Sequence, residues 1–338
     1  MEEKAIHIAI DNLTIGYKNP IVRHISAKIE AGSLIGLIGE NGAGKSTLLK
    51  TLARFISPLQ GEIAINNKRL ENFSLEELSK ILSIVTTQRV SISHYKVEDV
   101  VAFGRYPYGK WTRNLTGQDK EIVFNAIDDV QGKHLTGKYI NELSDGEYQR
   151  IMIARCLAQN TPVILLDEPT AFLDLNGKYE IINLLQTLAN QRNKIIIFSS
   201  HDLSLAIKYV SKLWFIQHNE LLEDTPEDLI LSGNMERIIH SSLISFNAIS
   251  GDFECAYQYH SKLNLSGSDL AVKWTKNALN KLGWTVTNQI AYPSLQINEN
   301  KNYFTWIYKQ SNESEEIEFY SMNDLSLFLK RLTKNKTL

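Results

Sequence analysis

Residues 39–46 read GENGAGKS and fit the pattern G-x-x-x-x-G-K-[S/T]. The apolar run 34–38 precedes them, and residues 45–55 follow with the apolar spacing of a helix. This order of strand, glycine-rich loop and helix is the context in which the pattern binds nucleotide phosphates. The flanking elements therefore favour a polyphosphate site over a glycine-rich turn that holds no ligand.

The chemistry of this loop follows from its residue types. Glycines let successive backbone N–H groups point into one concavity, and the helix N-terminus adds a partial positive charge. A lysine supplies a cation for the β- and γ-phosphates of ATP, a serine offers a hydroxyl ligand for Mg²⁺, and the next threonine is a further donor. The nucleotide-binding residues predicted here are Gly39, Asn41, Gly42, Gly44, Lys45, Ser46 and Thr47.

Two adjacent carboxylates follow the apolar run 163–166. Asp167 is predicted to hold Mg²⁺, and Glu168 to face the attacking water as the general base or orienting group. An acidic pair can also simply complement a helix dipole, but the phosphate loop upstream makes that interpretation the weaker one. A second apolar run, 195–198, is separated from the first by a segment with helical apolar spacing, so the sequence predicts a βαβ unit and a parallel sheet.

Residues 143–147 read LSDGE and resemble the signature motif of ABC-type ATPases. Ser144 and Glu147 form an S-x-x-E capping box, which predicts a helix start whose free N–H groups can meet an anion. In the family that anion is the γ-phosphate of ATP on the other subunit's phosphate loop. The resemblance therefore implies a head-to-tail homodimer in which Ser144 and Gly146 complete the partner's site. The motif departs from the common LSGGQ by placing Asp145 and Glu147 near the phosphate, which puts the ATPase rate in question.

Further family matches occur in order over about residues 5–245. They imply an adenine-stacking aromatic, a Q-loop glutamine that ligates Mg²⁺ and takes part in catalysis, a D-loop aspartate and a switch histidine at the γ-phosphate. Each alone also fits a core aromatic, a surface polar group or a helix cap, but the ordered set favours the family roles. The residues concerned are Tyr17, Gln88, Asp174 and His201.

The resemblance implies an α/β fold, with a parallel sheet core, an antiparallel β edge and a helical subdomain at about 91–160. We expect this P-loop ABC ATPase domain to cover residues 1–245. A small accessory α+β domain of unknown role is expected at 251–338, with strands near 295–297, 303–308 and 316–320 and a helix from Asn323. Its tryptophans are expected to form a core rather than a ligand platform. The inward positions predicted on its first helix, capped by Ser268, are Ala271, Trp274, Ala278 and Leu282.

A narrower resemblance is to ATP-binding subunits of importers for ferric siderophores, haem and cobalamin. It rests on VEDVVAFGRYPYGKW at 97–111, on residues 143–175 and on SSHDLSLAIKYVSKLWFI at 199–216. It implies membrane permease subunits as direct partners and a substrate-binding protein as an indirect one. It also implies a peripheral position on the cytoplasmic face of the inner (plasma) membrane.

Composition narrows the alternatives. The chain has 338 residues with 36 basic and 38 acidic side chains, so its net charge is -2 and we expect no nucleic-acid partner. With only two cysteines, we expect no disulfide framework. No apolar run reaches the about 18 residues that a membrane span needs, so we expect no such span. Residues 1–10 do not resemble a signal peptide. A soluble ABC ATPase acting on DNA or ribosomes, or an export-type ATPase, is the alternative function.

Overall fold

The computed structural model describes residues 6–87, 94–109, 115–238, 243–301 and 303–334. Of these, the residues up to Ile238 together with Ala248–Asp252 form one compact unit, and the remaining residues form a second. Within the described ranges, no helix is both long and apolar enough to cross a membrane.

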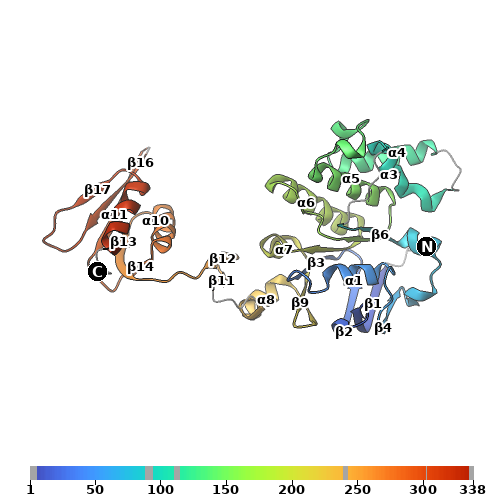
Figure 1. The fold of residues 1–338 in the computed structure, drawn as a ribbon, viewed down its shortest axis with the longest axis horizontal. Helices are drawn as coiled ribbons and strands as arrows, with labels where there is room; N and C mark the ends of the chain where they lie inside the picture. Colours follow the sequence, from blue (N-terminus) through green and yellow to red (C-terminus); the bar gives the residue numbers. More distant parts are fainter. Residues whose placement is uncertain (1–5, 88–93, 110–114, 239–242, 302, 335–338) are drawn as a thin grey trace. The chain divides into compact units, whose positions relative to one another are not determined.

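The first unit is built around a six-stranded sheet (Figure 1). Its inner strands are short and almost wholly apolar, as expected for a sheet that is covered on both faces. All neighbours run parallel except the antiparallel edge pair β10–β9. In sheet order the strands are β10 (Glu220–Asp224), β9 (Lys212–Gln217), β3 (Leu34–Gly39), β8 (Ile195–Ser200), β7 (Val163–Leu166) and β6 (Leu82–Val85).

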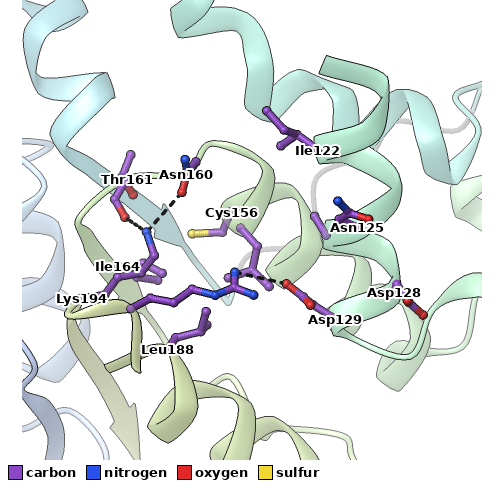
Figure 2. A pocket seen from close by; sticks show the side chains of 13 residues that line it. Ile122, Asn125, Asp128, Asp129, Cys156, Asn160, Thr161, Ile164, Leu188 and Lys194 are labelled. Carbon is purple, nitrogen blue, oxygen red and sulfur yellow. Dashed lines mark hydrogen bonds and ion pairs between the residues drawn. The ribbon is translucent and has the colours of Figure 1, made fainter. Parts of the chain in front are cut away.

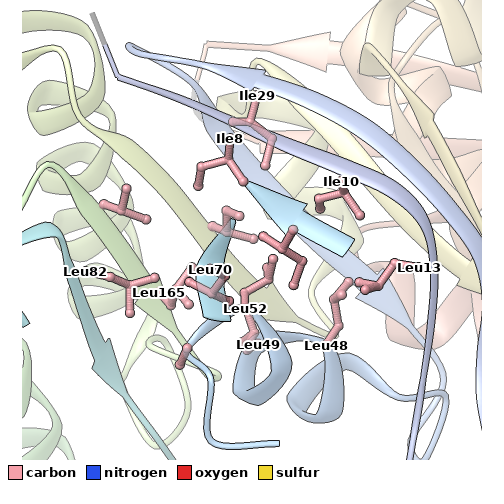
Figure 3. Close-up of a cluster of buried hydrophobic side chains, with 14 of the residues drawn as sticks. Ile8, Ile10, Leu13, Ile29, Leu48, Leu49, Leu52, Leu70, Leu82 and Leu165 are labelled. Atoms are coloured by element: carbon pink, nitrogen blue, oxygen red, sulfur yellow. The ribbon is translucent and has the colours of Figure 1, made fainter. Parts of the chain in front are cut away.

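A second, antiparallel sheet of four strands belongs to the same unit. Its strands, in order, are β2 (Pro20–Glu30), β1 (His7–Gly16), β4 (Gln60–Ile65) and β5 (Lys68–Arg69). Helix α1 (Lys45–Leu52) packs its leucines into a core that contains residues of both sheets, such as Ile10 of β1 and Leu165 of β7 (Figure 3). Because α1 begins at the predicted phosphate loop, this packing fixes the loop against the sheets.

The remaining helices of the first unit lie around the six-stranded sheet or in a separate helical group. Figure 1 shows α3, α4 and α5 gathered together, away from strands β1, β2 and β4, in the region where we predicted a helical insertion. The helices are α2 (Leu75–Ile81), α3 (Val97–Ala102), α4 (Gly117–Asp129), α5 (Asp145–Ala158), α6 (Leu175–Arg192), α7 (Leu203–Tyr209), α8 (Pro226–Leu231) and α9 (Asn234–Ile238).

These elements confirm the expected α/β architecture with a parallel core and an antiparallel edge. The strand predicted at 163–166 has the same bounds in the structure, and α3, α4 and α5 fall within the helical subdomain expected at about 91–160. The helix predicted at 45–55 ends three residues early, at Leu52, with Ala53 as its C-cap. The helical spacing between the two apolar runs corresponds to α6, in which Ile181, Leu185 and Leu188 are buried.

The second unit contains a five-stranded sheet with two helices, so the expected α+β character is confirmed. Its strands, in sheet order, are β14 (Trp284–Val286), β13 (Ser261–Ser266), β15 (Ser294–Asn300), β16 (Tyr303–Lys309) and β17 (Ile317–Phe319). The helices are α10 (Asp269–Lys281) and α11 (Met322–Lys334). The pair β11 (Ile244–Asn247) and β12 (Asp252–Cys255) forms a separate two-stranded sheet.

One of the inward positions predicted on α10 was wrong: Thr275, and not Trp274, lies in the core. Trp274 is 61% exposed, whereas Ala271, Thr275 and Leu279 are buried. Thr275 lies inward because its hydroxyl oxygen accepts a hydrogen bond from Trp306 Nε1 at 2.9 Å. A polar side chain is therefore satisfied inside this core, which an apolar pattern does not reveal.

We predict that two tryptophans of this unit differ sharply in their effect on stability. Trp284 is 1% exposed, so Trp284→Ala should lower the free energy of unfolding by about 3–5 kcal/mol. Trp274→Ala, the matched control at an exposed site, should change it by no more than about 0.5 kcal/mol. Hydrogen exchange of residues 261–334, measured by mass spectrometry on the full chain, reports both values. Equal loss of protection in the two variants would contradict the assignment.

Candidate nucleotide and metal site

The glycine-rich loop joins β3 to α1 and follows a left-handed path at two of its glycines. Gly42 has φ 81° and Gly44, the N-cap residue of α1, has φ 109°. A Cβ atom at Gly44 would lie 2.8 Å from Ile21 Cγ2, so a larger residue would displace the loop. The sequence requirement for glycine here has a steric cause as well as a conformational one.

Lys45 lies back over this loop. Its ammonium donates hydrogen bonds to the carbonyl oxygens of Gly39 at 2.7 Å and Glu40 at 2.9 Å. Burial lowers the pKa of Lys45, while the nearby carboxylates of Glu168 and Asp167 act in the opposite direction. The cation is therefore held at the mouth of the loop, close to both acidic residues.

Asp167 is the most constrained side chain of the site. It is 2% exposed, and its Oδ1 accepts hydrogen bonds from Ser46 Oγ at 3.0 Å and Ser199 Oγ at 2.7 Å. The structure thus brings the predicted metal residues Ser46 and Asp167 together from α1 and the end of β7. A hydroxyl and a carboxylate oxygen are the hard ligands that Mg²⁺ uses beside substrate phosphates, so these residues fit that ion.

Glu168 adopts a left-handed backbone conformation, with φ 53°. Its N–H donates to Ser199 Oγ at 2.8 Å, which holds the turn after β7 against β8. Its carboxylate Oε1 lies 3.2 Å from Nδ1 of His201, and the His201 side chain is 61% exposed. The two predicted catalytic residues therefore lie in contact, with the histidine accessible to a ligand.

The signature residues lie at the start of α5. Ser144 is its N-cap, and the expected capping box is present: Glu147 N–H donates to Ser144 Oγ at 3.3 Å, and Ser144 N–H donates to Glu147 Oε2 at 2.8 Å. That backbone hydrogen bond is the main reason that the pKa of Glu147 is lowered. The Glu147 carboxylate is thus held by the start of its own helix and by Lys138 Nζ, which lies 3.4 Å from Oε1.

The start of α5 also contacts the turn before α6. A Cβ atom at Gly146 would lie 3.2 Å from Leu173 Cδ2. The next residue, Asp174, is the N-cap of α6 and accepts a hydrogen bond from Gly177 N–H at 2.8 Å. Ser144, Gly146 and Asp174 thus belong to two adjoining helix N-termini.

The contacts described above do not include two of the predicted site residues, Tyr17 and Gln88. Tyr17 follows the end of β1 and is 62% exposed, so its ring is free of the core, contrary to its alternative interpretation as a core aromatic. Gln88 lies outside the described residues.

Sequence reasoning missed Ser199 and Gln149. Ser199 is fully buried and contacts both Asp167 and Glu168, while Gln149 Nε2 lies 3.5 Å from the Glu168 carbonyl oxygen. A signal for Ser199 was present, because two serines end an otherwise apolar strand directly before His201. Gln149 carried no comparable signal, since polar residues are ordinary in a helix.

Comparison with protein families gives two matches. A model of the ABC transporter family matches residues 22–171, and a model described as the iron ABC transporter C-terminal domain matches residues 260–330. The second match extends beyond the region over which the sequence showed a family resemblance, and it falls within the second unit.

Curated relatives carry the same family name. An uncharacterized ABC transporter ATP-binding protein of Methanocaldococcus jannaschii is 37% identical over 246 residues, which is 72% of this chain and 85% of the relative. The achromobactin transport ATP-binding protein of Dickeya dadantii is 38% identical over 60% of this chain and 75% of its own length. The ferric enterobactin transport ATP-binding protein of Escherichia coli is 30% identical over 70% and 89%.

Solved structures agree with the fold. A metal-chelate type ABC transporter in an inward-facing conformation matches with a TM-score of 0.61 and 26% identity, over 70% of this chain and 89% of that one. A bacterial ABC transporter cassette solved as a dimer matches with a TM-score of 0.59 and 25% identity, over 65% and 98%.

We predict that Ser199→Ala lowers ATP turnover about tenfold or more, because it removes a donor to Asp167 and an acceptor for Glu168 N–H. Ser211→Ala is the matched control. Ser211 also exchanges two hydrogen bonds with a strand, Leu34 of β3, but at the start of that strand rather than at its phosphate-loop end. Phosphate release by the purified full chain measures both. A Ser199 variant with the control's turnover would show that this residue only supports the fold.

Proposed function

Because the chain belongs to the ATP-binding subunits of ABC transporters, and so binds and hydrolyses ATP, we propose that it powers import of a ferric chelate through a separate membrane permease. The observation that carries the cargo class is the match of residues 260–330 to the iron ABC transporter C-terminal domain. Relatives named for achromobactin and ferric enterobactin transport favour a siderophore. Haem and cobalamin are the other candidate cargoes.

In this proposal the phosphate loop holds ATP. Backbone N–H groups from Gly39 to Lys45 surround the phosphates, and the first turn of α1 adds its dipole. Lys45 Nζ, already at the mouth of the loop, moves from the carbonyl oxygens of Gly39 and Glu40 to the β- and γ-phosphates. Thr47 adds a hydroxyl donor, and the exposed ring of Tyr17 stacks on the adenine.

Ser46, Asp167 and Gln88 are the proposed Mg²⁺ residues. Mg²⁺, when bound there, would neutralise the negative charge that develops on the phosphate oxygens. The bond from Ser199 Oγ keeps the Asp167 carboxylate oriented toward Ser46 Oγ. A buried carboxylate with fixed donors is pre-organised, so it need not reorient when the ion arrives.

Hydrolysis is assigned to Glu168. Its carboxylate accepts or orients the proton of the attacking water, while His201 Nδ1 at 3.2 Å holds one carboxylate oxygen in place. The exposed edge of the His201 ring is then available to the γ-phosphate. Glu168 contacts His201, whereas Asp167 contacts Ser46 and Ser199, so the two acids can serve different roles.

The complete site requires two copies of the chain. Ser144, Gly146 and Asp174 lie at the N-termini of α5 and α6, where the helix dipoles favour an anion. We propose that these residues cover the γ-phosphate held by the partner's phosphate loop, in a head-to-tail homodimer. The similar cassette that was solved as a dimer supports this arrangement.

The permease is proposed to dock on the 3-10 helix Phe103–Tyr108 and its surroundings. Two cavities, of 930 and 430 Å³, share Phe103 as a lining residue. Arg105 holds Tyr108 of this surface in place. Its guanidinium pairs with Asp119 at 2.9 Å and lies 4.1 Å from the centre of the Tyr108 ring. A subunit held here is peripheral to the membrane, on its cytoplasmic face, and meets the substrate-binding protein only through the permease.

We predict that Glu168→Gln lowers ATP turnover at least about 100-fold while ATP binding remains, so that an ATP-bound dimer accumulates. Glu227→Gln, an exposed carboxylate of α8, is the matched control and should hydrolyse normally. Phosphate release and size-exclusion chromatography with light scattering give the two measurements. A Glu168 variant that neither hydrolyses ATP nor forms a dimer in the presence of ATP would contradict the dimer mechanism.

The Glu168→Gln chain also tests the partner. It would be purified with MgATP from detergent-solubilised membranes of the source organism, and the proteins bound to it identified by mass spectrometry. A multi-span permease with a neighbouring chelate-binding protein supports the importer. Recovery of ribosomes, DNA or soluble partners alone would favour the soluble ABC ATPase instead.

A second variant tests the docking surface. Tyr106 is 54% exposed on the 3-10 helix, and Tyr106→Ser should reduce chelate uptake several-fold while basal ATP turnover is retained. Tyr303→Ser, an equally exposed tyrosine of the second unit at 56%, is the control for lost aromatic surface. Uptake of radiolabelled ferric siderophore into cells and phosphate release by the pure chain are measured together. Unchanged uptake in the Tyr106 variant would show that the permease docks on another surface.

A further inference from the structure

The first unit contains a cavity of 310 Å³ that the proposed ATPase mechanism does not use. Its walls come from α4, from α5 and the turn after it, from β7, from α6 and from the segment that enters β8 (Figure 2). The lower end of the size range for small-molecule sites is about 300 Å³. The cavity thus has room for one compact molecule between the helical group and the strands.

Lys194 places a positive charge at one end of this cavity. The residue is only 9% exposed, and its ammonium contacts two neutral oxygens, the Thr161 carbonyl at 2.6 Å and Asn160 Oδ1 at 3.4 Å. Among the described residues, no carboxylate lies within 4 Å of it. An ammonium has three donors, so neutral oxygens leave both a donor and the positive charge uncompensated.

The other charged groups of the cavity are already paired. Arg192 Nη1 lies 3.6 Å from Asp129 Oδ2, and Asp128 Oδ2 lies 2.8 Å from Lys133 Nζ. Figure 2 shows Asp128 and Asp129 on the side away from Lys194. The cavity therefore carries an excess of positive charge at the Lys194 end.

Apolar side chains form part of the lining between these ends. Ile164 and Leu188 are each 1% exposed, and the Cys156 thiol is directed to Ser83 Oγ at 2.8 Å. Desolvation lowers the pKa of the Lys194 ammonium, and the nearby Arg192 lowers it further, as expected for a cation that lacks an anionic neighbour. A ligand that matches this lining has one anionic group and a short apolar body.

We propose that the cavity is a binding site for a small carboxylate, with the carboxylate on Lys194 Nζ and the apolar body against Ile164 and Leu188. A carboxylate there would give the buried ammonium the charge-assisted hydrogen bond that its protein neighbours do not provide. Because its lining residues come from α4 and α5 and also from α6, β7 and the residue before β8, the ligand would bridge the helical group and the sheet. The site lies apart from the residues assigned to ATP, so it does not depend on the proposed transport role.

The test compares two probes of the same shape, benzoate and the neutral benzamide, on the full chain at matched ionic strength. Benzoate at ten times its Kd should raise the melting temperature of the ATPase unit by about 3 °C, and benzamide should leave it unchanged. Isothermal titration gives the two affinities directly. Stabilisation by benzamide equal to that by benzoate would overturn the proposal, because the cavity would then select shape and not charge.

Two variants separate the site from its surroundings. Lys194→Met keeps an unbranched side chain, one atom shorter, but removes the charge, and it should weaken benzoate binding about tenfold or more. Asn125→Trp, a change at an exposed position of the cavity wall, should block binding while it leaves Lys194 intact. Because Asn125 is exposed, this variant remains informative if Lys194→Met fails to fold. Benzoate affinity unchanged in Asn125→Trp would place the probe elsewhere and refute the assignment.

Discussion

The buried carboxylate of Asp167 is the interaction on which the rest of the site depends. A charge with 2% exposure needs compensating hydrogen bonds, and Ser46 from α1 and Ser199 from β8 provide them. Three elements that are distant in sequence are therefore held at one edge of the parallel sheet. The packing of α1 between the two sheets keeps the phosphate loop at that same edge.

This arrangement explains how two neighbouring acids serve different purposes. Asp167 is locked by two hydroxyl groups, whereas Glu168 leaves the strand through a left-handed turn and meets His201. Ser199 sets both, because it donates to the first carboxylate and accepts the backbone N–H of the second. Ser199 thus contacts both the proposed Mg²⁺ ligand, Asp167, and the proposed hydrolytic residue, Glu168.

The helical group connects three proposed functions. The start of α5 carries Ser144 for the partner's nucleotide, the neighbouring 3-10 helix carries the docking surface, and the end of α5 forms one wall of the cavity with Lys194. A molecule in that cavity would touch the same helix that meets the nucleotide.

The sequence by itself determined the features that depend on neighbouring residues. The phosphate loop, the capping box of Ser144 and the strand 163–166 are local, and each was predicted with its chemistry. The α+β character of the second unit followed from periodicity, whereas the extent of the ABC domain was an implication of the family resemblance. Family resemblance added the order of the remaining motifs, including Gln88, which lies outside the described residues.

The tertiary structure decided which residues distant in sequence come into contact, because strand pairing and core packing set these contacts. Ser199 reaches Asp167 because β7 and β8 pair in parallel with Leu166 beside Phe198, and no local pattern states that register. Trp274 lies outward because Trp306 donates to Thr275 from a strand more than thirty residues away. The Lys194 cavity likewise arises between elements distant in sequence, because a buried charge is defined by what surrounds it in space.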